Sequence, residues 1–234
     1  MPLRSILTGA LGAGLILLCA CTQSREPIRV GANLWPGYAP LFLAQGLGHH
    51  EAIGIRTLTF PSTIEVMRAY RNRAIDVAAV TADEALLLAE TDPDQRILLV
   101  CDYSNGADML MAGPGIADLP ALKGRRVGIE SGALGAYMLA RALDAAGLGA
   151  RDVEVVADDL RGLVQAFKDG RIDAVVAYEP YSSELAAAGA VVVFDSRSIP
   201  GEIVDVLVTR QSLIDERPEA IRALNQAYRI LFRE

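Results

Sequence analysis

The aromatic residues best placed to bind a ligand lie at the end of the first apolar, strand-like run. Trp35, the only tryptophan of the chain, and Tyr38 flank Pro36-Gly37 within the stretch NLWPGYAPLFLAQGLG. Proline fixes φ and glycine permits unusual φ values, so we expect a stiff turn that presents two aromatic faces. Such faces stack on flat or apolar ligands and attract cations. The alternative is that Trp35 packs only against its own domain.

A second candidate contact is the stretch ESGALGAY, in which Ser131 and Ala133 lie at the predicted start of a helix. Small side chains expose backbone N–H groups, and these groups together with the helix dipole can hold a carboxylate, phosphate or sulfonate oxygen. The alternative is that Gly132 and Gly135 only end the strand and allow close packing.

The predicted binding loops are acidic. The segments LWPGYA, TADE, YSNGAD, ESGALGAY and YEPY contain no Lys or Arg, whereas the loops carry Asp83, Glu84, Asp102, Asp108, Glu130, Glu179 and Glu202. An uncompensated carboxylate in a closed cleft is costly, so a small multivalent oxyanion such as sulfate is disfavoured. A neutral or cationic organic ligand, such as an amine or an aminopyrimidine, fits better.

Further candidate contacts follow other predicted strands, namely Thr81, Asp83, Asn105, Tyr178, Glu179 and Glu202. Asn105 could supply both a donor and an acceptor, and Glu202 is expected to face the cleft from IPGEIVDV. The alternatives are that Asp83 and Glu179 cap helices, and that Asn105 belongs to a plain Asn-Gly turn.

The sequence does not predict catalytic residues, a cofactor or a metal site. It contains no recognisable Ser/His/Asp set, and its two histidines are adjacent in GHHEAIG. Adjacent histidines on a helix point in different directions, so we expect His49 and His50 to lie at a solvated helix end. Cys101, in the apolar run RILLVCDY, is expected to be a buried strand residue.

A repeat indicates the elements that position these residues. Arg29-Val30-Gly31 recurs as Arg126-Val127-Gly128 after 97 residues, and the same offset relates Ala69-Tyr70 to Ala166-Phe167 and Ile75-Asp76 to Ile172-Asp173. A shared offset predicts two lobes built on one plan.

Each copy alternates strand-like and helix-like runs, which predicts βαβ units and a parallel sheet covered on both faces. Helices are expected at 40–47, 133–146 and 160–168, and in STIEVMRAYRNR, where Ser62 or Thr63 could cap the N-terminus. The expected fold class is α/β, with two similar open lobes. Ligands of such sheets bind beyond the carboxyl ends of the strands, which here places a cleft between the lobes.

The N-terminus has the layout of an export signal. One basic residue precedes an apolar run to Leu18, which is shorter than the roughly 20 residues of a spanning helix. Leu18-Cys19-Ala20-Cys21 resembles a bacterial lipobox, which implies a signal peptide at 1–20, lipidation of Cys21 and a linker at 21–27. The alternative is an uncleaved anchor helix. Both interpretations, a lipidated Cys21 and an anchor helix, place the body of the protein outside the inner membrane.

Composition narrows the class of protein. Hydrophobic residues make up 52% of the 234 residues and charged residues 22%, as is typical of a folded globular protein. The net charge of -7 and the absence of a Lys/Arg run exclude a nucleic-acid partner.

Four stretches of the sequence resemble, in the same order, stretches of the type II periplasmic substrate-binding proteins of the NMT1/THI5-like group. They are GYAPLFLAQGLG, RNRAIDVAAV, LKGRRVGIESGALGAYML and KDGRIDAVVAYEP. The group includes proteins that bind nitrate, sulfonates, taurine and the thiamine pyrimidine. The resemblance covers residues 28–233. It implies lobe one at 28–112 plus 204–234 and lobe two at 113–203. Family members usually carry several more helices, so either this copy is truncated or its lobe one is small.

The resemblance implies a monomeric solute-binding lipoprotein that closes on a small molecule and delivers it to the permease subunits of an ABC importer. The lipid anchor would be its only contact with the membrane. One alternative is a ligand sensor for a membrane signalling partner. Another is an enzyme like the thiamine-pyrimidine synthase of the same group, but that enzyme needs a cysteine-rich motif, which this sequence lacks.

Overall fold

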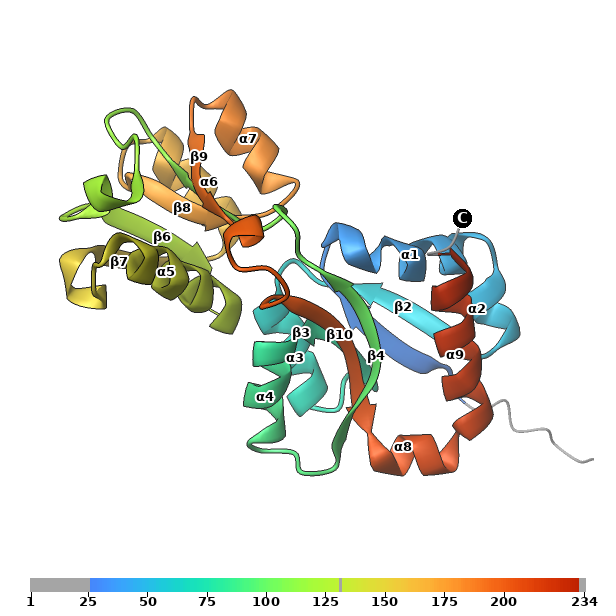
Figure 1. Cartoon of the computed structure of the whole chain (residues 1–234). Helices are drawn as coiled ribbons and strands as arrows, with labels where there is room; N and C mark the ends of the chain where they lie inside the picture. Colours follow the sequence, from blue (N-terminus) through green and yellow to red (C-terminus); the bar gives the residue numbers. More distant parts are fainter. Residues whose placement is uncertain (1–25, 131, 232–234) are drawn as a thin grey trace, which may run out of the picture.

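The computed structural model describes residues 26–130 and 132–231, which form two α/β lobes (Figure 1). The sheet of lobe one has the strand order β2-β1-β3-β10-β4. Its strands are β1 (Ile28–Ala32), β2 (Ile55–Thr59), β3 (Val77–Thr81), β4 (Gln95–Tyr103) and β10 (Val204–Arg210). The sheet of lobe two has the order β7-β6-β8-β5-β9. Its strands are β5 (Met109–Ala112), β6 (Arg126–Glu130), β7 (Glu154–Asp158), β8 (Ala174–Ala177) and β9 (Val191–Asp195).

The prediction of two similar α/β lobes is confirmed, but the sheets are not purely parallel. In lobe one, β1 pairs in parallel with β2 and β3, whereas β10 is antiparallel to β3 and β4. In lobe two, β5 is the antiparallel strand, between β8 and β9. The reversed strand of each sheet is the one that arrives from the other lobe, so its direction is set by the crossing and not by a βαβ unit.

The predicted helices at 40–47, 133–146 and 160–168 and in STIEVMRAYRNR are confirmed, with the first shifted by one residue, and further helices accompany them. In lobe one they are α1 (Ala39–Gly46), α2 (His49–Ala52), α3 (Thr63–Arg71), α4 (Ala82–Ala89), α8 (Gln211–Glu216) and α9 (Pro218–Leu231). In lobe two they are α5 (Ala133–Ala146), α6 (Leu160–Lys168) and α7 (Tyr181–Ala187). Ser62 caps α3 as predicted, since its side chain accepts a hydrogen bond from the N–H of Glu65. None of the helices among the described residues has the length and apolar character needed to cross a bilayer.

The two lobes repeat one another down to individual contacts. In lobe one, Asp76 accepts hydrogen bonds from the backbone N–H (2.9 Å) and the guanidinium of Arg29. In lobe two, Asp173 accepts the same bonds from Arg126, at 2.8 Å for the backbone N–H. Both pairs join the start of a strand to the start of its parallel neighbour. The predicted duplication is therefore confirmed by equivalent geometry at the predicted offset.

The chain crosses between the lobes twice, through residues 104–108 and 196–203 (Figure 1). The first crossing ends earlier than the sequence suggested, because β5 already belongs to the second sheet, so lobe two begins at Met109 and not at residue 113. The crossings are joined by a hydrogen bond of 2.8 Å between the hydroxyls of Ser104 and Ser196.

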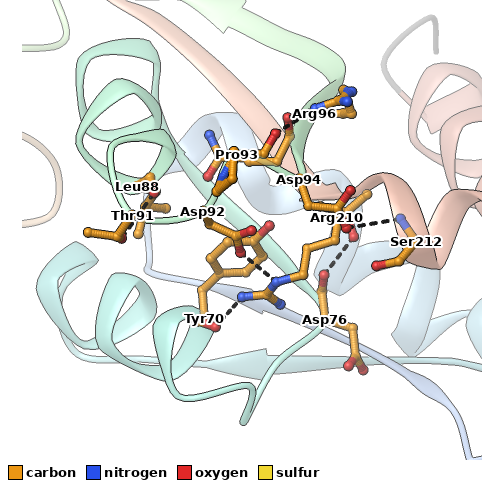
Figure 2. Close-up of polar contacts among 12 residues, drawn as sticks. Tyr70, Asp76, Leu88, Thr91, Asp92, Pro93, Asp94, Arg96, Arg210 and Ser212 are labelled. Atoms are coloured by element: carbon orange, nitrogen blue, oxygen red, sulfur yellow. Dashed lines mark hydrogen bonds and ion pairs between the residues drawn. The ribbon is translucent and has the colours of Figure 1, made fainter.

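The returning chain is held in lobe one by a buried arginine at the end of β10 (Figure 2). Arg210 pairs with Asp92 at 2.6 Å, donates to the backbone oxygen of Tyr70 at 2.9 Å and stacks 4.1 Å from the centre of the Tyr70 ring. Next to it, the N–H of Ser212 donates to Asp94. These contacts lie at the opposite end of β10 from Asp205, which faces the other lobe.

Candidate ligand-binding site

A small cavity of about 10 Å³, enough for one water molecule, lies where the two lobes meet. Both lobes and the first crossing contribute to it. Lobe one supplies Asn33, Trp35, Tyr38, Thr63, Thr81 and Asp205, lobe two supplies Leu134 and Tyr178, and the crossing supplies Asp108. The cavity therefore lies beyond the carboxyl ends of β1, β3 and β8, as expected for an open α/β sheet.

Three aromatic side chains, Trp35, Tyr38 and Tyr178, line the cavity. Trp35 is 7% exposed and meets Tyr178 edge to face, with ring centres 5.6 Å apart. Its indole N–H donates to Asp102 at 3.2 Å. The hydroxyl of Tyr38 donates to Asp205 at 2.5 Å. Trp35 thus packs in the core of lobe one and also contacts lobe two, so it does not pack only against its own domain. Its contact with a ligand stays a prediction.

The lobes are linked across the cavity through the hydroxyl of Tyr178. This hydroxyl accepts a hydrogen bond from the side-chain amide of Asn33 in lobe one at 3.1 Å and lies 3.4 Å from Glu130 in its own lobe. The amide of Asn33 also donates to Thr63 at 2.8 Å. Tyr178 therefore connects the two lobes at the cavity.

Two carboxylates, Asp108 and Asp205, line this cavity, and further carboxylates act on the residues of its wall. Burial raises the pKa of Glu84 to about 8, that of Glu130 to about 7 and that of Asp108 to about 6. Burial likewise raises the pKa of Asp102 and Asp205, and the charge of Asp102 raises that of Asp205 further. These carboxyl groups therefore favour either bound protons or a cationic partner.

A larger groove of about 370 Å³ also lies between the lobes, lined by Ile64, Met67, Arg71, Leu87, Ile129, Glu130 and Gly132. Its wall is mostly apolar. Arg71, on α3, is a basic side chain that the analysis of the loops did not place near the lobe interface, and it donates to the backbone oxygen of Leu87. Glu130 lines the groove and contacts Tyr178, which lines the cavity.

The structure brings together four of the predicted contacts, since Trp35, Tyr38, Thr81 and Tyr178 all line the cavity. Asp83 lies next to them, half-buried on α4, and does not cap that helix, which begins after Thr81. Ala133 is the first residue of α5, and its neighbour Leu134 reaches the cavity. Ser131 and Cys21 lie outside the described residues.

Three other predicted contacts lie elsewhere. Asn105 is exposed in the first crossing. Glu179 accepts a hydrogen bond from Ser183 on α7 at 2.9 Å. Glu202 does not face the cavity, because it forms an ion pair of 2.8 Å with Arg141 on α5 and accepts a hydrogen bond from Tyr137.

Sequence reasoning did not select Asn33, Thr63 or Asp205, and it counted Asp108 only as a loop acid. Two of these carried a signal: Asn33 directly follows a strand, and Asp205 interrupts the apolar run IVDVLV. A polar residue inside a buried strand needs a partner, and Asp205 finds one in Tyr38. The sequence does not show which residue is that partner, because this depends on how β10 packs beside β4.

The expectation of two solvated histidines is half wrong. His49 is exposed, but His50 is only 1% exposed and lies 3.0 Å from the Thr57 hydroxyl on β2. Its contact with β2 turns it into the lobe. Among residues 26–130 and 132–231, no three His, Cys, Asp or Glu side chains are grouped so that they could hold a metal ion. Cys101 is buried in β4, as predicted.

Two lobes of this topology, joined by two crossings around a cavity, have the architecture of the type II periplasmic binding proteins. The periplasmic aliphatic sulphonate binding protein SsuA from Escherichia coli shares this fold, with a TM-score of 0.75 and 21% identity over 88% of this chain and 72% of SsuA. The desulfurization enzyme DSZB shares it too, with a TM-score of 0.66 and 19% identity over 88% of this chain and 75% of DSZB.

The chain belongs to the NMT1-like family, whose sequence profile matches residues 22–229. A relative from Brucella abortus, named as a binding protein, is 28% identical over 220 residues, which cover 85% of this chain and 63% of the relative. The chain thus spans somewhat less than two thirds of the length of that relative.

Proposed function

We propose that this protein is the extracytoplasmic solute-binding component of an ABC importer and that it captures a small neutral or cationic organic ligand by closure of its lobes. The observation that carries this proposal is the cavity between the lobes, which is lined by three aromatic rings and two carboxylates. Family membership and the fold shared with SsuA support the binding role. The sulphonate in the name of SsuA is an anion, and the acidic cavity favours a different ligand.

In this mechanism the two crossings act as the hinge. Ligand entry separates Tyr178 from Asn33, which frees the space between the lobes. The rings of Trp35 and Tyr38 then pack on the ligand from lobe one, while Tyr178 and Leu134 close over it from lobe two. Closure presents a continuous two-lobed surface to the permease, which is the proposed partner.

We propose that the protein performs no chemistry of its own. The cavity wall contains neither a histidine nor a cysteine, and the buried Cys101 has a pKa raised by burial, which makes it a poor nucleophile. The fold alone does not decide this, since DSZB is an enzyme. The substitution of Cys101 by Ser should therefore leave ligand binding unchanged.

We further propose that the chain is exported, cut before Cys21 and held at a membrane as a monomer by a lipid on that cysteine. Expression in a bacterial host should give a membrane-associated protein whose mass equals residues 21–234 plus the lipid. The variant Cys21→Ser should be released from the membrane. A wild-type protein that keeps residues 1–20 and still resides in the membrane would point to the anchor-helix alternative.

The binding function is tested by native mass spectrometry of the gently purified protein, followed by titration with pyrimidines, amines, amino acids and sulfonates. We expect a co-purified small molecule and saturable binding of a neutral or cationic compound. No binding at millimolar concentration would contradict the proposal. Neighbouring genes for a permease and an ATPase would support import, whereas a sensor kinase or cyclase gene would favour the sensing alternative.

A further inference from the structure

We propose that the ligand is an organic cation that carries N–H groups, and that Asp108 is the carboxylate that binds them. This inference rests on the proposed binding function and narrows its ligand class. It excludes quaternary ammonium compounds, which carry the same charge without an N–H group.

Asp108 lines the cavity, and hydrogen bonds hold its backbone. Its N–H donates to the Ser104 hydroxyl at 3.2 Å, and its backbone oxygen accepts a hydrogen bond from the N–H of Ser196 at 3.0 Å. These two bonds attach Asp108 to both crossings, between the two lobes.

The side chain of Asp108 has unused hydrogen-bonding capacity. It is 1% exposed and lines the cavity, and no hydrogen bond of regular geometry reaches either of its carboxylate oxygens among the described residues. Of these residues, the only donor close enough to act on the carboxylate is the neutral hydroxyl of Ser104. A buried carboxylate without partners costs free energy. A partner supplied by the ligand removes this cost.

The surroundings favour a cation as that partner. Asp102 and Asp83 act electrostatically on Asp108, and Asp205 lines the same cavity. The nearby Ser104 hydroxyl is neutral and cannot compensate their charge. Because no group of His, Cys, Asp or Glu in the described residues could hold a metal ion, the geometry points to an organic cation.

The two carboxylate oxygens of Asp108 distinguish cations that carry N–H groups from quaternary ammonium ions. A carboxylate that lacks donors gains most from a charged N–H donor, because such hydrogen bonds are about twice as strong as neutral ones. A quaternary ammonium would supply the charge but leave both oxygens without a donor. The rings of Trp35 and Tyr178 can accommodate the apolar part of either compound.

The test uses the fluorescence of Trp35, the only tryptophan of the chain, which lies in the cavity wall. The full chain is titrated near neutral pH with two matched pairs of probes, benzylamine with benzyltrimethylammonium and ethanolamine with choline. Benzyl alcohol and phenylmethanesulfonate serve as neutral and anionic probes. In at least one pair, we expect the N–H cation to bind about tenfold or more tightly than its quaternary partner.

The variant Asp108→Asn keeps the shape of the side chain and removes its charge. We expect it to bind the N–H cation at least about tenfold more weakly, with an unchanged or higher melting temperature, because an unpaired buried charge has been removed. Glu154→Gln, an exposed change on β7, is the matched control and should bind like the wild type.

Equal or tighter binding of both quaternary probes would overturn the inference, as would unchanged affinity of Asp108→Asn or no binding of either N–H cation. Binding of benzyl alcohol alone would also overturn it while leaving the proposed binding function intact. Failure of every probe, together with the absence of a co-purified molecule, would count against the proposed function itself. Tight binding of the sulfonate alone would overturn the preference for a cation in both proposals.

Discussion

At the residue scale, the carboxylates between the lobes make the stability of the ligand-free protein depend on pH. Burial raises the pKa of Glu84 to about 8, so the folded state binds more protons than the unfolded state between the unfolded value and pH 8. Stability therefore falls as the pH rises through this window, by about 1.4 kcal/mol for each unit of the pKa shift. Glu130 and Asp108 contribute in the same direction.

Thermal melts at pH 6 and pH 8 should therefore show a lower melting temperature at pH 8. Glu84→Gln should reduce the difference, because glutamine can still accept the hydrogen bond from the N–H of Thr81 but does not ionise. The exposed change Glu154→Gln is the control. The same pH dependence in Glu84→Gln and the wild type would contradict the assignment.

At the element scale, the repeated strands need glycine at the same position. A Cβ on Gly31 of β1 would lie 2.5 Å from the Cδ1 of Ile75, and one on Gly128 of β6 would lie 2.7 Å from the Cδ1 of Ile172. Both isoleucines are buried and have little room to move. In each lobe, therefore, an isoleucine in a helix-to-strand connection packs against the glycine of the lobe's first parallel strand, and this packing is part of the duplication.

Gly31→Ala should lower the free energy of unfolding by about 1–3 kcal/mol through overpacking. The double variant Gly31→Ala/Ile75→Val should recover part of this loss, because valine lacks the Cδ1 atom. Gly128→Ala with Ile172→Val forms the equivalent set in lobe two. Denaturant melts give the comparison, and no recovery in either double variant would contradict the packing argument.

Also at the element scale, the buried ion pair of Arg210 fixes the end of β10 against lobe one (Figure 2). Arg210→Ala should lower the free energy of unfolding by about 3 kcal/mol, because it leaves the Asp92 carboxylate without its partner. Arg96→Ala is the matched control, since Arg96 is exposed and its guanidinium donates to backbone oxygens. Equal losses in the two variants, measured by urea titration, would refute this role of Arg210.

At the scale of the whole molecule, the Tyr178 hydroxyl stabilises lobe contact without a ligand. Tyr178→Phe removes the hydrogen bond from Asn33 and keeps the ring against Trp35. The ligand-free variant should therefore open more often, and small-angle X-ray scattering should give a larger radius of gyration than for the wild type. Tyr181→Phe, a change beside it on α7, is the control. An unchanged radius in Tyr178→Phe would show that other contacts hold the lobes together.

The sequence by itself determined the elements and the plan of the lobes. The bounds of α5 and α6 and a cap at Ser62 or Thr63 follow from local periodicity and capping chemistry, which are short-range patterns. The plan of two lobes follows from the repeated residue pairs at an offset of 97. It also indicated that Trp35, Tyr38, Thr81 and Tyr178 lie near one another, because residues that follow parallel strands gather at one edge of a sheet, and all four line the cavity. Their contact with a ligand stays a prediction.

Only the tertiary structure decided which strand of each sheet runs backwards and where lobe two begins, because both depend on how the crossings enter the opposite lobe. It also decided which acids face the cavity. Glu202 pairs with Arg141, whereas Asp108 and Asp205, 97 residues apart, meet at the lobe interface. Sequence shows that a carboxylate is present, but its partner and burial arise from contacts between distant segments, and these contacts determine whether it binds a ligand.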